Sequence, residues 1–307
     1  MIAPAYRDQV DLMLQLLPDV AKEEVFALKG GTAINMFVRD MPRLSVDIDL
    51  TYLPFDDRNT ALRNISEALK RIKERLSKAI PGIKVASQPQ SDGQDAKLLC
   101  QLRQAQVKIE VNTVMRGHIR PIRLMQITGS AEEEFKKSVA INVISHAELF
   151  GGKICAALDR QHPRDLFDVH HLLENEGFSD DIMPGFITGL LSSPRPAHEL
   201  LRPNFSDQRM VFDTQFSGMT IAPFTYDDHE KARIRLVKEI HEHLTDNDRA
   251  FLLSFHTGAP DWSRIPVLQL KDLPALRWKL SHIQKLMQEN PAKHAALVKA
   301  AEEAFSY

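Results

Sequence analysis

Apolar residues at the start of the chain recur at helical spacing and then form a short uninterrupted run. Residues 6–17 and 19–24 are expected to form two helices, because a proline between them ends the first repeat. The run 25–28 is entirely apolar and stops at Gly30 and Gly31. This pattern predicts a buried strand that leads into a glycine turn.

Two further helices are predicted before the pattern changes. Thr32 is expected to cap a helix that continues to about residue 38. Residues 59–79 place leucine and isoleucine on one face and many lysines and arginines on the other, which is typical of a long amphipathic helix. We interpret its basic face as solvated rather than as a binding surface.

Between residues 82 and 142 the pattern becomes that of strands separated by short polar turns. Alternation in 107–111 places Lys108 and Glu110 on one face and three apolar residues on the other. A mixed sheet flanked by helices is therefore predicted. The expected strands are 83–87, 97–102, 107–113, 121–126 and 139–143.

Helical periodicity returns after residue 145 and continues to the end of the chain. Residues 192–225, rich in proline, serine and phenylalanine, are expected to form a connection with short helices. The fold class is α+β, with a mixed-sheet domain over 1–144 and an all-helical domain over 145–307. One helix is expected to start at Pro163. Further helices are predicted over 226–244, 246–255, 272–288 and 291–305.

Three carboxylates are the strongest chemical signal in the sequence. In a strand over 47–50, Asp47 and Asp49 project from the same face, and Glu110 projects from a strand of the same sheet. Neighbouring carboxylates repel one another unless a positive charge neutralises them, and hard divalent cations prefer oxygen ligands. We therefore expect Asp47, Asp49 and Glu110 to bind two Mg²⁺ ions, with Mn²⁺ as an alternative.

The glycine pair upstream suggests a phosphate group as the partner of this metal site. Gly30 and Gly31 allow the backbone to approach a phosphate closely and direct N–H groups at it. The sequence lacks the downstream Gly-Lys-Ser/Thr of a P-loop. A metal-bound nucleoside triphosphate is thus the expected ligand, held in a site of another class.

Composition excludes several other classes of protein. The 307 residues include 39 basic and 41 acidic side chains, a net charge of −2, so the chain has no overall basic field for nucleic acid. The two cysteines lie far apart, and none of the 12 histidines shows a convincing metal-ligand spacing. No apolar run has the length of a transmembrane segment. We expect a cytoplasmic protein without membrane contact.

Several sequence blocks, in this order, resemble the AbiEii/AbiGii toxin family of the DNA polymerase β-like nucleotidyltransferase superfamily. The resemblance spans roughly residues 20–175. It depends on Lys29-Gly30-Gly31-Thr32, Ser45-Val46-Asp47-Ile48-Asp49-Leu50, Lys108-Ile109-Glu110, Lys153-Ile154-Cys155-Ala156-Ala157-Leu158-Asp159-Arg160 and Arg164-Asp165-Leu166-Phe167-Asp168. It implies that domain 1–144 is a nucleotidyltransferase domain.

The resemblance also implies roles for individual residues. Lys153 would contact a phosphate oxygen, and Asp165 would orient Lys153, the nucleotide or the acceptor hydroxyl. Arg160 and Arg164 would contact RNA. The alternatives are a solvated Lys153, an Asp165 that stabilises the start of its helix, and arginines that pair with Asp159 and Asp168. The nucleotide-binding residues would be Lys29, Gly30, Gly31, Thr32, Ser45 and Lys153, and the catalytic residues would be Asp47, Asp49, Glu110, Lys153 and Asp165.

The function implied by the resemblance is that of a toxin from a toxin–antitoxin or phage-defence pair. Such an enzyme would transfer a nucleoside monophosphate from a nucleoside triphosphate to an RNA hydroxyl, with the 3′ acceptor end of tRNA as the first expectation, and would block translation. A cognate antitoxin would be encoded nearby. Two alternatives remain at this point: a transferase that acts on a small-molecule or protein hydroxyl, and a nucleotide-binding partner protein without catalysis.

Overall fold

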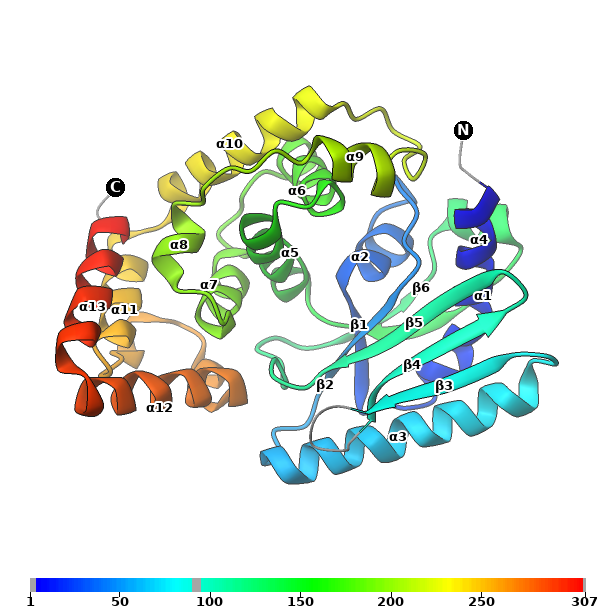
Figure 1. The fold of residues 1–307 in the computed structure, drawn as a ribbon, viewed down its shortest axis with the longest axis horizontal. Coiled ribbons are helices and arrows are strands. Elements are labelled where there is room, and N and C mark those ends of the chain that lie inside the picture. Colours follow the sequence, from blue (N-terminus) through cyan, green and yellow to red (C-terminus); the bar gives the residue numbers. More distant parts are fainter. Residues whose placement is uncertain (1–3, 90–94, 306–307) are drawn as a thin grey trace. The chain divides into compact units, whose positions relative to one another are not determined.

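A seven-stranded mixed sheet forms the centre of the first of two compact units. The computed structural model describes residues 4–89 and 95–305 and divides the chain into one unit of residues 1–145 with 216–223 and another of 146–215 with 224–307. The strand order is β3-β4-β5-β2-β1-β7-β6 (Figure 1). The strands are β1 (Phe26–Lys29), β2 (Ile48–Tyr52), β3 (Lys84–Pro89), β4 (Asp95–Leu102), β5 (Ala105–Asn112), β6 (Arg123–Gln126) and β7 (Ala140–Val143).

The pairing of these strands confirms the predicted mixed sheet. β2 pairs with β5 and β1 with β7 in parallel, and all other neighbours are antiparallel. Val107, Ile109 and Val111 of β5 are almost fully buried, whereas Lys108 and Glu110 on its other face are partly exposed. The alternation read from the sequence is therefore present in the strand.

Two long helices pack against the apolar side of this sheet. α1 (Pro4–Ala21) contacts β5 and β7, and α3 (Arg58–Ala79) contacts β3 and β4. The prediction of two helices over 6–17 and 19–24 was wrong, because α1 continues through Pro18. Pro18 lies in the last turn, where it removes a single backbone hydrogen bond, and Val20 beyond it is still buried.

The glycine turn leads into helical structure that differs in detail from the expected capped helix. α2 (Gly30–Ala33) continues directly into a π-helical turn, Ile34–Val38. Thr32 was predicted to cap this helix, and that prediction was wrong. Lys29 is the N-cap residue, and its side chain forms no capping hydrogen bond. The Thr32 hydroxyl instead donates a hydrogen bond to the Asp47 carbonyl oxygen. This bond ties the glycine turn to the residues that enter β2.

A segment from the second half of the chain completes the first unit. Residues 216–223, which the sequence analysis assigned to the helical domain, pair with the approach to β2. The Leu44 N–H donates to the Met219 carbonyl at 2.8 Å, and Arg43 forms a β-bridge with Thr220. The segment belongs to this unit because its backbone groups form hydrogen bonds there and the Met219 side chain is buried there.

The second unit is entirely helical in its described residues. The sequence analysis missed α7 here and α4 (Gly129–Phe135) in the first unit. Within residues 4–89 and 95–305, no helix combines the length and apolar character needed to cross a bilayer. The helices are α5 (His146–Arg160), α6 (Pro163–Asn175), α7 (Met183–Ser192), α8 (Ala197–Leu201), α9 (Arg209–Gln215), α10 (Tyr226–His243), α11 (Asp246–His256), α12 (Pro274–Glu289) and α13 (Pro291–Phe305), with 3₁₀ turns at Trp262–Arg264 and Leu268–Asp272.

Glycines allow α5 and α7 to pack backbone against backbone. A Cβ atom added to Gly151 would lie 2.2 Å from the carbonyl carbon of Gly185, and one added to Gly185 would lie 1.9 Å from the Ala147 carbonyl oxygen. Real Cβ atoms do not approach so closely. α5, which carries Lys153, is therefore held against α7 by a contact that only glycine permits.

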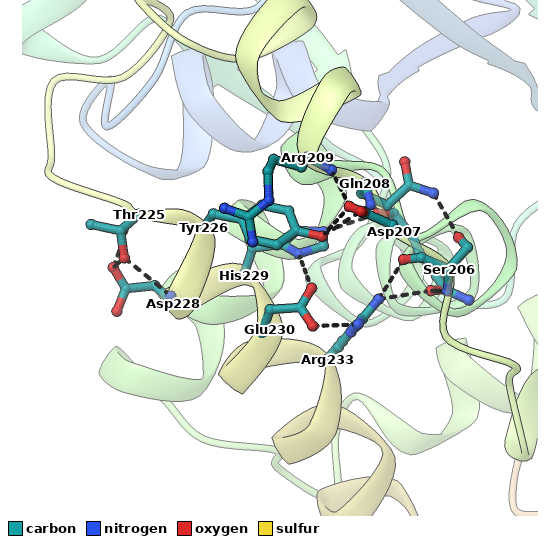
Figure 2. A network of polar contacts seen from close by, with 11 residues as sticks. Ser206, Asp207, Gln208, Arg209, Thr225, Tyr226, Asp228, His229, Glu230 and Arg233 are labelled. Carbon is teal, nitrogen blue, oxygen red and sulfur yellow. Dashed lines mark hydrogen bonds and ion pairs between the residues drawn. The ribbon is translucent and has the colours of Figure 1, made fainter.

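A polar network connects α10 to the segment before α9 and to the turn between α5 and α6. The His229 ring is fully buried, stacks on Tyr226, and places Nε2 3.1 Å from the Gln161 carbonyl oxygen. Arg233 donates to the Ser206 carbonyl at 2.8 Å, and Figure 2 shows how both side chains converge from α10. These bonds fix the backbone just before Asp165.

Candidate active site

Two of the three predicted carboxylates lie on the adjacent strands β2 and β5 of the first unit, and the third directly precedes β2. Asp49 of β2 and Glu110 of β5 are register partners in the parallel ladder, so their side chains project from the same face. Asp47 lies two residues before Asp49, directly ahead of β2. All three are only partly buried. The structure therefore brings together the carboxylates that the sequence analysis proposed as a group.

Three lysines balance the charge of these carboxylates. Lys29 of β1 is the register partner of Asp49, and Lys97 of β4 is that of Glu110. Lys97 Nζ lies 2.6 Å from Glu110 Oε1, and Lys108 Nζ lies 2.7 Å from Glu110 Oε2. The three lysines thus share one face of the sheet with Asp49 and Glu110, and Asp47 lies directly before that face.

The pKa values of these groups reflect the pairing. Burial would raise the pKa of the Glu110 carboxyl, but the ion pairs with Lys108 and Lys97 outweigh it and hold that pKa below its usual range. Burial lowers the pKa of Lys29, and the nearby Asp49 and Glu110 charges oppose this only in part. The sequence analysis had noted Lys108 on the face of Glu110 but had missed Lys97, which only the β4–β5 register brings to it.

The glycine turn lies against the carboxylates. Gly30 has a φ of 73°, and a Cβ atom there would lie 2.7 Å from Asp49 Oδ2. A Cβ atom on Gly31 would meet the Arg43 guanidinium at 2.7 Å and Ser45 Oγ at 2.9 Å. Glycine is favoured at position 30 by the left-handed backbone conformation, and a side chain at position 31 would displace the Arg43 guanidinium and the Ser45 hydroxyl.

Arg43 is a polar residue of this turn that the sequence analysis missed. Its side chain is 2% exposed, and its guanidinium donates to the Leu44 carbonyl oxygen at 2.8 Å. Ser45 Oγ lies 3.0 Å from Thr32 Oγ1, so the predicted Ser45 does lie beside the turn. The closeness of Arg43 to Gly31 depends on the strand-like pairing of residues 42–44 with 219–222, which no local pattern indicates.

Carboxylates are suitable ligands for a divalent cation. The three carboxylates of this site, however, are not all arranged to bind one. Two aspartates beside the glycine turn offer the hard oxygen ligands that Mg²⁺ prefers. Both Glu110 oxygens, however, contact lysines. In the part of the chain that the structure describes, no group of three Asp, Glu, His or Cys side chains is arranged to hold a metal ion.

The second unit holds the other predicted catalytic pair in a buried cluster. Lys153 Nζ of α5 lies 2.8 Å from Asp165 Oδ1 and 3.1 Å from Asp168 Oδ2 of α6. The Lys153 side chain is 7% exposed, so the alternative of a solvated helix lysine was wrong. Asp168, the last residue of the sequence block that contains Asp165, is as buried as Asp165. Its spacing of one helical turn from Asp165 was the signal for its presence on the same face.

Arg160 completes this cluster from its exposed edge. Its Nε lies 2.6 Å from Asp165 Oδ2, while its side chain remains 62% exposed. Burial would raise the pKa of the Asp165 carboxyl, but Lys153 and Arg160 hold it well below its usual range. Asp159, one of the alternative partners considered for Arg160 and Arg164, forms an ion pair with Arg195 at 2.8 Å.

A match to a family model identifies the proteins to which this chain is related. Residues 11–282 match the model described as "Nucleotidyl transferase AbiEii toxin, Type IV TA system". The chain belongs to the AbiEii nucleotidyltransferase toxin family. The resemblance inferred from the sequence blocks is thereby confirmed, and this AbiEii protein is a nucleotidyltransferase toxin of a type IV toxin–antitoxin system. The family implies a nucleotide substrate and a cognate antitoxin.

A solved structure supports the fold of the AbiEii chain. The nucleotidyltransferase toxin MenT4 from Mycobacterium tuberculosis H37Rv is similar with a TM-score of 0.62 and 14% sequence identity, over 92% of this chain and 95% of that one. At this identity the likeness concerns the fold. The search of curated proteins gave no match.

Proposed function

We propose that this toxin catalyses the metal-dependent transfer of a nucleoside monophosphate from a nucleoside triphosphate to an RNA hydroxyl, with the 3′ end of tRNA as acceptor. Translation and growth would stop as a result, and the antitoxin would counteract this effect. The observation that carries the proposal is the register of Asp49 with Glu110 beside the glycine turn. The site of action would be the cytoplasm, where both substrates are available.

The first unit would bind the triphosphate through its glycine turn. Gly30 and Gly31 place no side chain of their own beside Asp49 and Ser45, and backbone N–H groups at the start of α2 are suitable donors to phosphate oxygens. Lys29 would add a positive charge, and Thr32 and Ser45 would keep the turn in place through their 3.0 Å contact. The turn would thereby hold the α-phosphate beside the carboxylates.

Asp47 and Asp49 would hold the divalent cation, with Glu110 as the third ligand once its oxygens leave the lysines. When bound, the cation would lower the pKa of the acceptor hydroxyl and offset charge at the α-phosphate and the leaving pyrophosphate. The acceptor hydroxyl gives its proton to solvent, its oxygen forms a bond to the α-phosphorus, and the bond from that phosphorus to the leaving oxygen breaks. Pyrophosphate is then released.

The roles of the second unit are proposed from the family resemblance. Lys153 would contact a phosphate as a point charge, and Asp165 would orient it, which is supported by their 2.8 Å ion pair. The exposed side of Arg160 and the partly exposed Arg164 would contact RNA. All of these roles belong to the proposed nucleotide transfer. Replacing any of these residues should therefore reduce the rate of transfer.

The test is a transfer assay with purified protein, each labelled nucleoside triphosphate in turn, and a tRNA pool. We expect Mg²⁺-dependent label on RNA and release of pyrophosphate. Asp49→Asn should reduce the rate about 100-fold or more, since metal stabilisation of the transition state contributes several kcal/mol. Glu133→Gln, at an exposed carboxylate of α4, is the control and should keep full activity.

Growth inhibition should follow the transfer activity. Asp49→Asn should allow cells to grow when expressed without antitoxin, and Glu133→Gln should not. Label on cell protein or on a small molecule, with none on RNA, would identify a different acceptor and reject this proposal. Nucleotide binding without pyrophosphate release would reject catalysis altogether.

A further inference from the structure

The two oxygens of Glu110 are each occupied by a different lysine. Lys97 reaches Oε1 from the antiparallel neighbour β4, and Lys108 reaches Oε2 from two positions earlier in the same strand. The Glu110 side chain is 29% exposed and both lysine side chains are 37% exposed. The ion pairs are therefore open to solvent and can exchange with other partners.

The two lysines oppose a cation at this site in two ways. A carboxylate oxygen that accepts a hydrogen bond from an ammonium group has less electron density to offer a metal ion, and Mg²⁺ demands near-ideal ligand geometry. The Lys108 charge also acts on Asp47 and Asp49. Each added positive charge close to the carboxylates makes a divalent cation less favourable there.

We propose that Lys97 and Lys108 compete with the divalent cation for Glu110 and thereby set the cation affinity of the carboxylate site. This inference rests on the proposed function, because it takes Asp47, Asp49 and Glu110 as the cation site. In the cation-free protein the lysines neutralise Glu110. For a cation to bind, Glu110 must exchange its two ammonium partners for one metal ion. The lysines therefore act on the cation through Glu110, as positioning residues.

The experiment measures Mn²⁺ binding to the whole chain without nucleotide, by the loss of the free-Mn²⁺ electron paramagnetic resonance signal. The variants are Lys97→Gln, Lys108→Gln and the double variant. We expect the double variant to bind Mn²⁺ roughly 2- to 30-fold more tightly than the wild type, the range expected for two partly exposed ion pairs. Lys84→Gln, at an exposed lysine of β3, removes a charge from the same sheet and should leave the affinity unchanged.

A further substitution separates specific competition from general charge. Adding Glu110→Gln to the double variant should abolish the gain in Mn²⁺ affinity, because the ligand that the lysines occupied is gone. Equal affinity in the wild type and the double variant, or an equal gain in Lys84→Gln, would overturn the proposal.

Thermal unfolding provides a second readout that needs no activity. Without its lysines Glu110 adds to the repulsion between Asp47 and Asp49, so the double variant should melt at a lower temperature than the wild type and regain more stability on addition of Mn²⁺. A melting temperature that does not respond to Mn²⁺ in either protein would also overturn the proposal. Failure of RNA labelling with the expected Mn²⁺ result would reject the proposed function alone.

Discussion

Asp49 and Glu110 lie side by side on the adjacent parallel strands β2 and β5, although they are far apart in the sequence. Their common face exists because successive side chains of a strand point to opposite faces, and because the parallel pairing aligns Asp49 with Glu110. Gly30, the first residue of α2, lies against Asp49 in the same region. Several consequences for stability and activity can be tested.

Gly30→Ala should damage the glycine turn and the carboxylates together. The residue has a φ of 73°, a conformation that costs a residue with a Cβ atom about 1–2 kcal/mol, and the new methyl would also lie 2.7 Å from Asp49 Oδ2. We expect a loss of at least this free energy of unfolding, measured by urea denaturation, and loss of nucleotide transfer. Gly129→Ala, where a Cβ atom meets nothing within 4 Å, is the matched control.

Adjacent glycines of α5 should respond in opposite ways to alanine. Gly151→Ala places a Cβ atom 2.2 Å from the Gly185 backbone and should lower the free energy of unfolding by about 3 kcal/mol or more. Gly152→Ala meets nothing within 4 Å and should raise stability by about 0.5–1 kcal/mol, because alanine favours the helix. Urea denaturation of both variants measures the difference. Equal effects would contradict the backbone contact between α5 and α7.

Lys153→Met should destabilise the protein apart from any effect on catalysis. The substitution leaves Asp165 and Asp168 buried without their common partner, which typically costs about 3–5 kcal/mol. The triple variant Lys153→Met, Asp165→Asn, Asp168→Asn removes both charges and should recover part of this loss. If the triple variant folds and lacks transfer, the cluster has a role beyond stability; if it transfers at the wild-type rate, the proposed role of Lys153 is wrong.

The Asp165 ion pairs should make the free energy of unfolding depend on pH in the acid range. Because the folded state lowers the pKa of this carboxyl from its ordinary value of 3.8, its contribution is complete above that value and is lost as the pH falls below it. We expect the free energy of unfolding to decrease between about pH 5 and about pH 3, and Asp165→Asn to show a smaller decrease over this range. Urea denaturation at several pH values measures this slope. An identical slope in both proteins would show that Asp165 does not contribute.

The local patterns of the sequence determined most of the elements and the carboxylate group. Apolar alternation and helical periodicity depend only on neighbours along the chain, so β5, α3 and α10 agree closely with their predicted ranges. The aspartates of Asp-Ile-Asp share a face for the same local reason. The glycine pair could also be interpreted locally as a turn, since glycine readily adopts the positive φ found at Gly30.

Only the tertiary structure decided which side chains neutralise one another. Lys97 reaches Glu110 through the β4–β5 register, residues 216–223 join the first unit through backbone pairing with 42–44, and Asp168 shares Lys153 with Asp165. Each contact links residues distant along the chain or on separate helices, so no short-range periodicity encodes it. Charge type and spacing specify which residues are available, whereas the pairing of strands and the packing of helices determine which of them meet.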